Sequence, residues 1–404
     1  MTIDNITIII SAILIVLAIA TSLLSNPFFR LGAKDDDTPL DDDDCTDAQD
    51  KPDGQASEET SAASAFKGPR LSVVVLSNGS AEQMDSHLSA ILTQDYAPRF
   101  EVIVVAVQRD SQTEDVLKRY GNNAKLYTTF VPQRSLFMSR SKLAATIGVK
   151  AAHNEWVVLT DSRYTPLSDE WLKAMSTGCA TGTDLVLGYS CYADNAKPFY
   201  RFERLREQAY AMRRADKGTA IFAKGGNIMF RKDLFINNDG YRGNLQFVQG
   251  EYDFIINKYA QEGNTAVVTR PEAWMQEDAP FTNAWRIDQI GFVNYRGHLR
   301  GATSYRWLHA IDTLALYVNY AACIGCGIWG AVAQNWVLTG AAALALIITL
   351  ATRTIIATKV FHRFDTRLSA WRAVPYELRA FWHTWLIRIR YTFADKHVFT
   401  SHKL

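Results

Sequence analysis

The chain has 404 residues, of which 48% are hydrophobic and 21% are charged. This length can hold one large domain plus attached segments, and the hydrophobic fraction is high for a soluble protein. The formal net charge of +1 is an average over acidic and basic segments, so it says nothing about binding partners. Part of the chain is therefore expected to lie in lipid.

An uncharged apolar run lies near the start of the chain. Residues 6–24, ITIIISAILIVLAIATSLL, are long enough to span a bilayer as a helix. The preceding MTIDN lacks the basic residues that begin a secretory signal. We predict an uncleaved transmembrane signal-anchor within residues 1–30, with a cleaved signal peptide as the alternative.

An acidic segment follows this run. Residues 35–54, DDDTPLDDDDCTDAQDKPDG, contain no aromatic side chain and are dominated by aspartate, a composition typical of chain that cannot form a packed core. We predict that residues 31–68 form a disordered tether. A metal-collecting role for the aspartates is the alternative, but a flexible run cannot fix the coordination geometry of an ion.

From Leu71 the hydrophobic pattern changes to short β-branched runs that alternate with amphipathic stretches. The predicted strands are 71–77, 100–107, 124–131 and 156–160. The predicted helices are 80–94, capped by Ser80, 111–121, capped by Ser111, and 139–153. This alternation predicts an α/β fold with a mostly parallel central sheet and helices on both faces.

Candidate ligand-binding residues follow the predicted strands. The sequence contains neither GxGxxG after its first strand nor GxxxxGK[ST], so neither a dinucleotide-binding Rossmann unit nor a P-loop is supported. In an open parallel sheet the ligand lies beyond the carboxyl ends of the strands. There the sequence offers Ser77, Asn78, Asp110 and Asp161. Serine and asparagine are also common turn residues, and Asp110 could equally cap the helix that follows it.

Two more apolar runs lie towards the C-terminus and are close enough to form a transmembrane hairpin. The runs are 311–333 and 336–351, within a predicted hairpin at 308–352. Basic residues flank one side of each of the three apolar runs, for example Arg30 after the first and Arg353 after the third. By the positive-inside rule, the domain predicted for residues 69–300 and the tail face the cytoplasm.

The last segment, 353–404, is predicted to be a basic, amphipathic cytoplasmic tail. One helical face would carry the apolar side chains Leu378, Phe381, Trp382, Trp385 and Ile389. This pattern predicts a helix lying in a membrane interface. A helix packed on the preceding domain would show the same stripe, so both interpretations stay open.

The ordered set of motifs between about Leu71 and His298 resembles family-two glycosyltransferases, the inverting enzymes of GT-A fold. The motifs are LSVVVLSNGSAEQ, FEVIVVAVQRDS, SKLAATIGVKAAHNEWVVLTDS, GGNIMFRK, GEYDFIIN and PEAWMQEDAP. The likeness is greatest to the membrane-anchored bacterial subgroup with a hydrophobic segment at each end. It implies a GT-A domain held at the bacterial inner membrane, a nucleotide-diphosphate-sugar donor, a divalent cation (Mg²⁺ or Mn²⁺) and a carboxylate base.

Two positions depart from the family pattern. Where the family has Asp-x-Asp, with the second aspartate on the metal, this chain has Asp161-Ser162-Arg163, so Asp161 is the one metal ligand that remains. Either the metal is gone, or the site is gone, or Arg163 neutralises the leaving diphosphate in place of a cation. A further interpretation is a surface arginine paired with Asp161 or Asp169. The family's aspartate after the second strand is also missing, and Asp110 is the nearest carboxylate.

The motif QGEYDFIIN aligns with the family's acidic cluster. The resemblance assigns Glu251 as general base and Asp253 as its supporting carboxylate. A base is required to remove the proton of the acceptor hydroxyl as that oxygen attacks the anomeric carbon. As first-turn residues of a helix beginning at Gly250, the two acids could instead serve only the helix dipole.

The same resemblance assigns the other site residues. The predicted nucleotide-sugar set is Ser77, Asn78, Asp110, Lys142, Asp161 and Arg163. The predicted sugar and acceptor set is Gly226, Asn227, Trp285, Arg296 and His298. Processive members carry an arginine-tryptophan motif that is not intact here, since NAWRIDQIGFVNYRGH offers only Gln289, Arg296 and His298 as remnants. Transfer of a single sugar is therefore predicted.

We predict a membrane enzyme that moves one sugar from a nucleotide-diphosphate sugar to a lipid-linked or surface-glycan acceptor, with inversion. Its expected partners are the donor, the acceptor and membrane lipid, and no nucleic acid. The alternative is a catalytically weakened relative that binds a nucleotide sugar or another transferase as a partner subunit. The altered Asp161 motif favours the alternative, and Glu251 with Asp253 favours the enzyme. A transporter is disfavoured, because spans without charge pairs offer no pathway.

Overall fold

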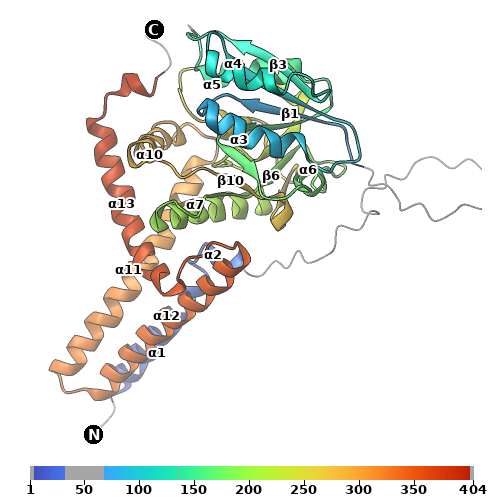
Figure 1. Ribbon diagram of the computed structural model, residues 1–404. Coiled ribbons are helices and arrows are strands. Elements are labelled where there is room, and N and C mark those ends of the chain that lie inside the picture. Colours follow the sequence, from blue (N-terminus) through green and yellow to red (C-terminus); the bar gives the residue numbers. More distant parts are fainter. Residues whose placement is uncertain (1–3, 32–67, 136, 401–404) are drawn as a thin grey trace, which may run out of the picture. The chain divides into compact units, whose positions relative to one another are not determined.

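The computed structural model describes residues 4–31, 68–135 and 137–400, so the predicted acidic tether lies almost wholly outside the described residues. The chain divides into two compact units, which we call the helical unit and the sheet unit (Figure 1). The helical unit comprises Met1–Asp35, Lys197–Arg213 and Gly301–Thr392; the sheet unit comprises Asp36–Ala196, Arg214–Arg300 and Phe393–Leu404. Lys197–Arg213 thus lies inside the predicted domain 69–300 in sequence but belongs to the helical unit.

A seven-stranded sheet forms the centre of the sheet unit, with strand order β3-β2-β1-β4-β8-β6-β9. The strands are β1 (Leu71–Leu76), β2 (Phe100–Val107), β3 (Leu126–Val131), β4 (Trp156–Asp161), β6 (Leu185–Gly188), β8 (Ile228–Arg231) and β9 (Thr265–Val268). Strands β1 to β4 are parallel, as are β6 and β9, whereas β8 runs antiparallel to β4 and β6. The predicted mostly parallel sheet is confirmed.

Helices connect and cover these strands. Those of the sheet unit are α3 (Ala81–Leu92), α4 (Ser111–Arg119), α5 (Arg140–Ala151), α6 (Trp171–Ser176), α8 (Lys232–Asn237), α9 (Glu251–Tyr259) and α10 (Thr282–Arg296), with short 3₁₀ turns η1 (Pro271–Ala273) and η3 (Lys396–Val398). The predicted cap of α3 is confirmed, because Ser80 and Gln83 form a reciprocal capping box. The predicted cap of α4 is wrong by one residue: Asp110 accepts the hydrogen bond from Thr113 N–H, and Ser111 is already helical.

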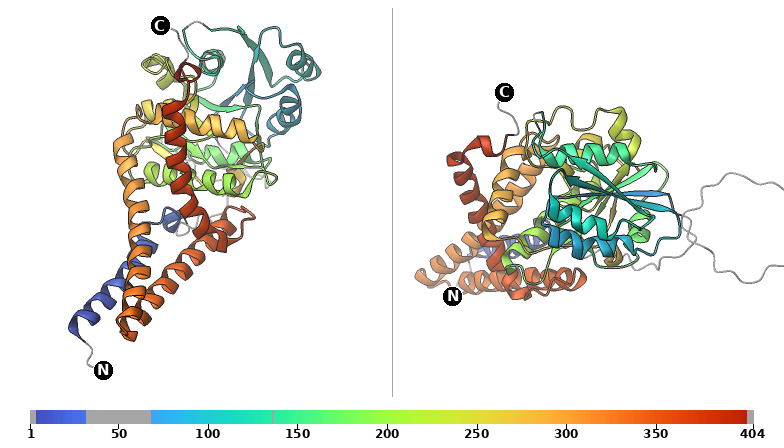
Figure 2. Two further views of the ribbon diagram at one scale, coloured as in Figure 1. Left: turned by 90° about the vertical axis from the view of Figure 1, so that its left-hand side faces the viewer. Right: turned by 45° about the horizontal axis from the view of Figure 1, so that its top comes forward.

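Helices lie on both faces of the central sheet (Figure 2). The alternation of side chains along β1 gives the reason. Val73 and Val75 belong to one core cluster with Leu88 of α3. The intervening Val74 points to the opposite face, where α5 packs. Gly148 permits this close packing, since a Cβ atom there would lie 2.3 Å from a Val74 methyl carbon. The prediction of helices on both faces is therefore confirmed.

A second, smaller sheet has the order β5-β10-β7. Its strands are β5 (Tyr164–Pro166), β7 (Ser190–Tyr192) and β10 (Met275–Glu277). Strand β10 pairs antiparallel with β5, with Glu277 opposite Tyr164. Because β5 begins shortly after β4 ends at Asp161, this pairing brings the segment MQEDAP to the carboxyl end of β4.

The helical unit consists of helices from three separate parts of the chain. They are α1 (Asn5–Leu23), α2 (Phe28–Leu31), α7 (Pro198–Lys217, in this unit up to Arg213), α11 (Ala302–Val332), α12 (Trp336–Arg363) and α13 (Ala373–Phe393), with a 3₁₀ turn η2 (Ala370–Arg372). Three of them, α1, α11 and α12, are long and apolar enough to cross a membrane. They lie side by side in both views of Figure 2 and share an apolar cluster that includes Leu14, Cys323 and Ala342. Their positions match the three predicted spans.

The tail helix α13 combines packing with exposure. The Arg379 guanidinium lies 4.1 Å from the centre of the Phe199 ring, so α13 packs on α7 within the helical unit. Three aromatic side chains of the predicted apolar face, Phe381, Trp382 and Trp385, are nevertheless exposed. Contact of this aromatic face with a membrane interface stays a prediction.

Candidate active site

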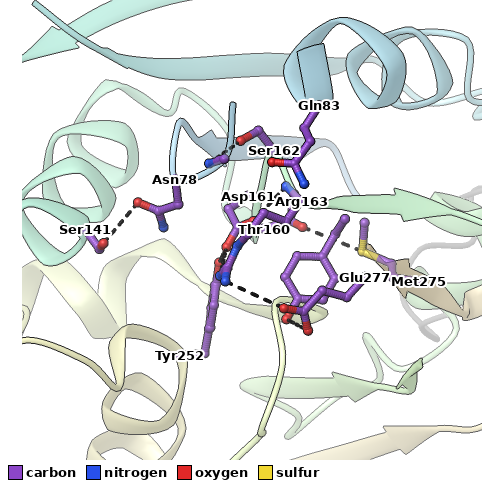
Figure 3. Close-up of polar contacts among 12 residues, drawn as sticks. Asn78, Gln83, Ser141, Thr160, Asp161, Ser162, Arg163, Tyr252, Met275 and Glu277 are labelled. Atoms are coloured by element: carbon purple, nitrogen blue, oxygen red, sulfur yellow. Dashed lines mark hydrogen bonds and ion pairs between the residues drawn. The ribbon is translucent and has the colours of Figure 1, made fainter. Parts of the chain in front are cut away.

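Asp161 is the last residue of β4 and lies beside Leu76 of β1 in the parallel register. Its side chain is fully buried, and four hydrogen bonds fill its carboxylate (Figure 3). Oδ1 accepts from the backbone N–H and Nε of Arg163, at 2.9 and 3.0 Å, and Oδ2 accepts from Arg163 Nη2 and the Tyr252 hydroxyl, at 2.6 and 2.8 Å. Burial alone would raise the pKa of Asp161, but the Arg163 guanidinium outweighs burial and holds that pKa below its usual value.

Arg163 bridges two carboxylates. Besides Asp161, its Nη1 lies 3.6 Å from Glu277 Oε1, and Glu277 Oε2 accepts a hydrogen bond from the Tyr164 hydroxyl at 2.8 Å. The predicted pairing of Arg163 with Asp161 is confirmed. However, Asp161 is buried while the Arg163 side chain is 38% exposed, so this is not an ion pair between two surface side chains. Part of the Arg163 side chain therefore stays exposed at the end of the sheet.

The turn of residues 161–163, at the end of β4, is held by hydrogen bonds to the loop after β1 and to α3. Ser162 Oγ accepts a hydrogen bond from Gly79 N–H at 2.8 Å, and His87 Nδ1 lies 3.0 Å from the Ser162 carbonyl oxygen. A side chain at position 79 would meet Ser162 Oγ at 2.8 Å, so the loop needs glycine there. The Arg163 carbonyl in turn accepts from Asp278 N–H. These contacts fix the backbone on both sides of Arg163.

The residues at this position do not fit the divalent cation that the family resemblance implies. A carboxylate-held Mg²⁺ or Mn²⁺ needs several free oxygen ligands at one point. Both Asp161 oxygens already accept hydrogen bonds, and Arg163 stands where the family has its second aspartate. Among the residues that the structure describes, no group of three or more His, Cys, Asp or Glu side chains could hold a metal ion. Side chains of the chain itself, rather than a cation, are therefore the groups available at this position to interact with a diphosphate.

Helix α9 brings Glu251 to the same region. Gly250 caps this helix with φ of 89°, a conformation that favours glycine, and a Cβ there would crowd the Phe254 and Tyr295 rings. The next residue after Glu251, Tyr252, donates the hydrogen bond to Asp161. Burial raises the pKa of the half-buried Glu251 carboxyl and the Asp161 charge adds to this, while the charges of Arg163 and Lys142 oppose it.

Asp253 points away from Glu251 and has a different environment. Its Oδ1 accepts from the backbone N–H groups of Ala223 and Lys224, at 2.9 and 2.8 Å, and its Oδ2 accepts from the Tyr295 hydroxyl at 2.6 Å. The side chain is buried. Asp253 thus anchors the chain just before Gly226, and its predicted role as a supporting carboxylate stays a prediction.

Gly226 and Asn227 follow this anchored segment. A Cβ on Gly226 would lie 2.9 Å from the Tyr164 ring and 3.1 Å from the Tyr252 ring, so only glycine lets both tyrosines approach Asp161 and Glu277 as they do. The Asn227 amide donates to the carbonyls of Tyr189 and Ala273 and accepts from the Trp171 indole. Its side chain is committed to these structural bonds, and contact with a sugar stays a prediction.

Lys142 is fully buried in α5 and meets backbone rather than open space. Its ammonium donates hydrogen bonds to the carbonyls of Asn244 and Phe247, at 2.8 and 2.6 Å, and lies 4.5 Å from the centre of the Phe254 ring. Burial lowers the pKa of Lys142 to about 7, with the Glu251 charge opposing that shift. Lys142 therefore holds the loop that leads into Glu251, although the sequence pattern predicted contact with the donor.

The other predicted site residues vary in their surroundings. Ser77 N–H bonds the Val105 carbonyl, Asn78 Oδ1 accepts from Ser141 Oγ, and Asp110 caps α4, which was its alternative interpretation. Trp285 is buried, the Arg296 guanidinium lies 5.9 Å from the centre of the Phe292 ring, and the His298 ring packs against Phe247 at 4.7 Å. Nothing in these contacts tests their assignment to donor or acceptor.

Sequence reasoning missed Tyr252, Tyr164 and Glu277 as part of this cluster. Tyr252 lies between the two acids of GEYD, and Glu277 lies in MQEDAP, so both occur in the motifs that carry the resemblance. A pairing between β5 and β10 was the missing information, since it places Glu277 beside Tyr164. No local sequence signal predicts that pairing.

Comparison with known proteins agrees with the fold. Residues 69–286, more than half of the chain, match the family described as "Glycosyltransferase like family 2". No curated protein matches the chain in sequence.

Solved structures give more distant likenesses. A mannosyltransferase from Pyrobaculum calidifontis, in complex with GDP-Man and Mn²⁺, shares 20% identity with a TM-score of 0.48, covering 90% of this chain and 99% of that one. S. aureus TarS 1–349 in complex with UDP-GlcNAc shares 13% identity with a TM-score of 0.39, covering 77% and 88%. No inference about the ligands of this chain follows from likenesses this distant. The family match over residues 69–286 is what identifies the protein: the chain belongs to the family-two-like glycosyltransferases and is a transferase.

Proposed function

We propose that the protein transfers a single sugar from a nucleotide-diphosphate sugar to a lipid-linked or surface-glycan acceptor, with inversion, and that Glu251 is its general base. The observation that carries this proposal is the Glu251 carboxyl. It is half-buried, its pKa is raised by burial, and its electrostatic neighbours are Asp161 and Arg163 at the carboxyl end of β4. A general base works best when its pKa is shifted toward the operating pH.

In the proposed reaction, Glu251 accepts the proton of the acceptor hydroxyl. The acceptor oxygen forms a bond to the anomeric carbon from the face opposite the diphosphate, and the bond from that carbon to the diphosphate oxygen breaks. The products are the glycosylated acceptor, a nucleoside diphosphate and a protonated Glu251, which then releases its proton to solvent. Inversion follows from a single displacement.

We assign Arg163 to the departing diphosphate. Its side chain is partly exposed at the end of β4, and a guanidinium suits phosphate oxygens. The Arg163 guanidinium forms ion pairs with Asp161 and Glu277. Those carboxylates therefore orient the guanidinium and partly neutralise its positive charge. Lys142 and Asp253 are assigned to positioning the two segments next to the base.

The alternative is a weakened relative that binds a nucleotide sugar as a partner subunit. The observation favouring it is the Asp161 carboxylate, whose oxygens are already filled by Arg163 and Tyr252. A screen of the full-length protein against common nucleotide sugars separates the two, with donor hydrolysis and thermal shift measured with and without Mn²⁺. Turnover of one donor supports the transferase; binding without turnover across donors and acceptors leaves the partner subunit ahead.

We further propose that the protein lies in a bacterial inner membrane with its sheet unit on the cytoplasmic side, where nucleotide sugars are made. Three helices that could cross a membrane and the basic residues flanking them support this orientation. Protease added to sealed inverted vesicles should remove the sheet unit and the tail. Protection of both segments would contradict the orientation and the access to donor that it provides.

A further inference from the structure

The helical unit contains a pocket whose lining is mainly polar and charged. Side chains that line it include Arg206 and Tyr210 of α7, Asp312 of α11, Arg353 of α12 and Glu377 of α13. The pocket has a cavity volume of about 30 Å³, and the larger empty space of about 370 Å³ includes its open mouth. All of these residues belong to the helical unit, so the pocket is independent of the sheet unit and of the proposed reaction.

Two arginines in this lining have unused donors. Arg353 is 2% exposed; its Nη1 donates to Glu377 Oε2 at 2.7 Å and its Nη2 to the Thr21 carbonyl at 2.9 Å, yet its Nε has no partner. Arg206 is 9% exposed; its Nη groups bond His309 and Glu203, and its Nε likewise has no partner. A buried guanidinium N–H is costly to leave unpaired. Both donors call for an acceptor oxygen, and the oxygens of a phosphate group suit a guanidinium well.

The charges of the lining limit what kind of phosphate can enter. Two guanidiniums, Arg206 and Arg353, face two carboxylates, Asp312 and Glu377. A ligand with a net negative charge would leave a buried cluster with one uncompensated charge, which is strongly unfavourable. A zwitterion adds no net charge. Its phosphate can accept from the two arginines while a primary ammonium donates to the carboxylates.

The position of the pocket indicates that this zwitterion belongs to a lipid. The lining residue Ser25 follows the end of α1, Asp312 lies in the first half of α11, and Arg353 lies in the second half of α12, so the pocket is at one end of the three apolar helices. On α13, next to the lining residue Phe381, Trp382 and Trp385 are exposed. Tryptophans of this kind are enriched at the level of lipid headgroups.

We propose that this pocket binds the headgroup of one zwitterionic phospholipid that carries a phosphate and a primary ammonium, as in phosphatidylethanolamine. The phosphate takes the free Nε donors of Arg206 and Arg353, and the ammonium lies against Asp312 and Glu377. The apolar side chains Leu316 and Phe381 cover the glycerol end of the lipid. The lipid thereby completes the hydrogen bonding of four helices from distant parts of the chain.

The test uses the full-length protein in mild detergent, supplied separately with phosphatidylethanolamine, phosphatidylcholine or phosphatidylglycerol. Native mass spectrometry should detect one retained phosphatidylethanolamine, and this lipid should raise the thermal unfolding temperature most. Choline cannot donate hydrogen bonds and the glycerol headgroup lipid is anionic, so both should bind at least about tenfold more weakly. Stronger binding of phosphatidylglycerol would overturn the argument from charge balance. Inorganic phosphate and soluble phosphoethanolamine should not stabilise the protein, and an equal effect of either would overturn the lipid origin.

Variants separate the lipid site from folding. Arg353→Met alone would leave Glu377 buried without its partner, so the double variant Arg353→Met/Glu377→Met removes both charges and keeps an apolar contact. It should fold and bind phosphatidylethanolamine at least about tenfold more weakly. Arg206→Gln should weaken binding similarly, whereas Arg388→Gln, an exposed arginine of α13, is the matched control. A folded double variant that retains the lipid like the wild type would overturn the proposal.

Discussion

The two units each bury a cluster of charged side chains, and the clusters differ in which groups they leave unpaired. In the sheet unit, the Asp161 carboxylate accepts hydrogen bonds from Arg163 and Tyr252. Within the described chain, by contrast, no side chain hydrogen-bonds the Glu251 carboxyl. In the helical unit the carboxylates are paired: Asp312 by Tyr210 and Arg213, and Glu377 by Arg353. Among the atoms there that lack a hydrogen-bond partner are guanidinium donors of Arg206 and Arg353 and one carboxylate oxygen, Glu203 Oε1.

This difference indicates how a buried charge is used. A carboxyl that no side chain hydrogen-bonds, and whose pKa burial raises, is suited to exchange a proton during catalysis. Unpartnered guanidinium donors cannot exchange protons near neutral pH, because arginine stays charged, so they are suited to hold an oxygen-bearing ligand. The same physical cost of burial therefore points to catalysis in one unit and to ligand binding in the other.

The largest expected effect comes from removing the Glu251 carboxyl. Glu251→Gln keeps the size of the side chain but cannot accept a proton, so turnover should fall by roughly two to four powers of ten with donor affinity nearly unchanged. In the wild type, kcat/KM should rise with pH through a pKa above the usual glutamate range, because the base must be deprotonated. The variant should lack this rise.

Glu82→Gln is the matched control, because Glu82 also lies in the first turn of a helix but is exposed. It should leave turnover and its pH profile unchanged. If Glu251→Gln kept a confirmed activity within a few-fold, the contrast between the two clusters would fail, and Asp253 would be tested as the base.

The next effect is on stability and comes from the fully bonded acid two residues later. Asp253→Ala leaves two buried backbone N–H groups and the Tyr295 hydroxyl without an acceptor, so the free energy of unfolding should fall by about 3 kcal/mol or more. Asp253→Asn keeps one acceptor oxygen and should cost less. Asp115→Ala, at an exposed helix pair, should change stability by no more than about 1 kcal/mol. Equal loss in both alanine variants would contradict an anchoring role.

Arg163 tests whether a guanidinium has replaced the metal. Arg163→Ala should lower the rate by roughly ten- to a hundredfold, the size of a lost charge-assisted hydrogen bond. Wild-type activity should resist EDTA, whereas Arg163→Asp should introduce dependence on Mn²⁺ or Mg²⁺. A wild-type rate abolished by EDTA would refute the replacement.

The same variant has a pH signature. The folded pKa of Asp161 is depressed, so the stability it contributes is present above the ordinary aspartate pKa and is lost as pH falls through the folded value. Without Arg163, burial would raise that pKa instead, and protonation would relieve a buried charge. The stability gap between wild type and Arg163→Ala should therefore narrow as the pH falls from 7 towards about 4, as measured by thermal unfolding.

The sequence predicted the first four strands, the Ser80 cap and the position of Asp161, because these depend on local pattern and on the rule that parallel strands end at one edge. It could not predict that the Tyr252 hydroxyl, 91 residues away in sequence, donates a hydrogen bond to Asp161, because that contact depends on how β5, β10 and α9 converge. Charge pairs for the predicted spans were not expected from the sequence either. In the structure, Asp312 pairs with Arg213 and Arg353 pairs with Glu377, and both partners lie outside the spans. Tertiary packing decides which partners buried charges have, and short-range sequence periodicity contains no information about that packing.

The last test concerns Lys142 and separates a loop anchor from a donor contact. Its folded pKa of about 7 lies below the ordinary lysine pKa of 10.5, so between these values the unfolded chain binds more protons than the folded one. Stability should therefore rise with pH across this window in the wild type relative to Lys142→Met, by at most about 1.4 kcal/mol per pH unit. Thermal unfolding of both proteins between pH 7 and 10 measures this difference, with Lys150→Met, near the end of the same helix and exposed, as the control.

In assays at fixed pH, Lys142→Met should lower kcat more than it raises the KM for donor, because the ammonium holds the Asn244–Phe247 loop and does not meet the ligand. A variant with a raised donor KM and an unchanged kcat would instead return Lys142 to the donor site that its sequence motif predicted.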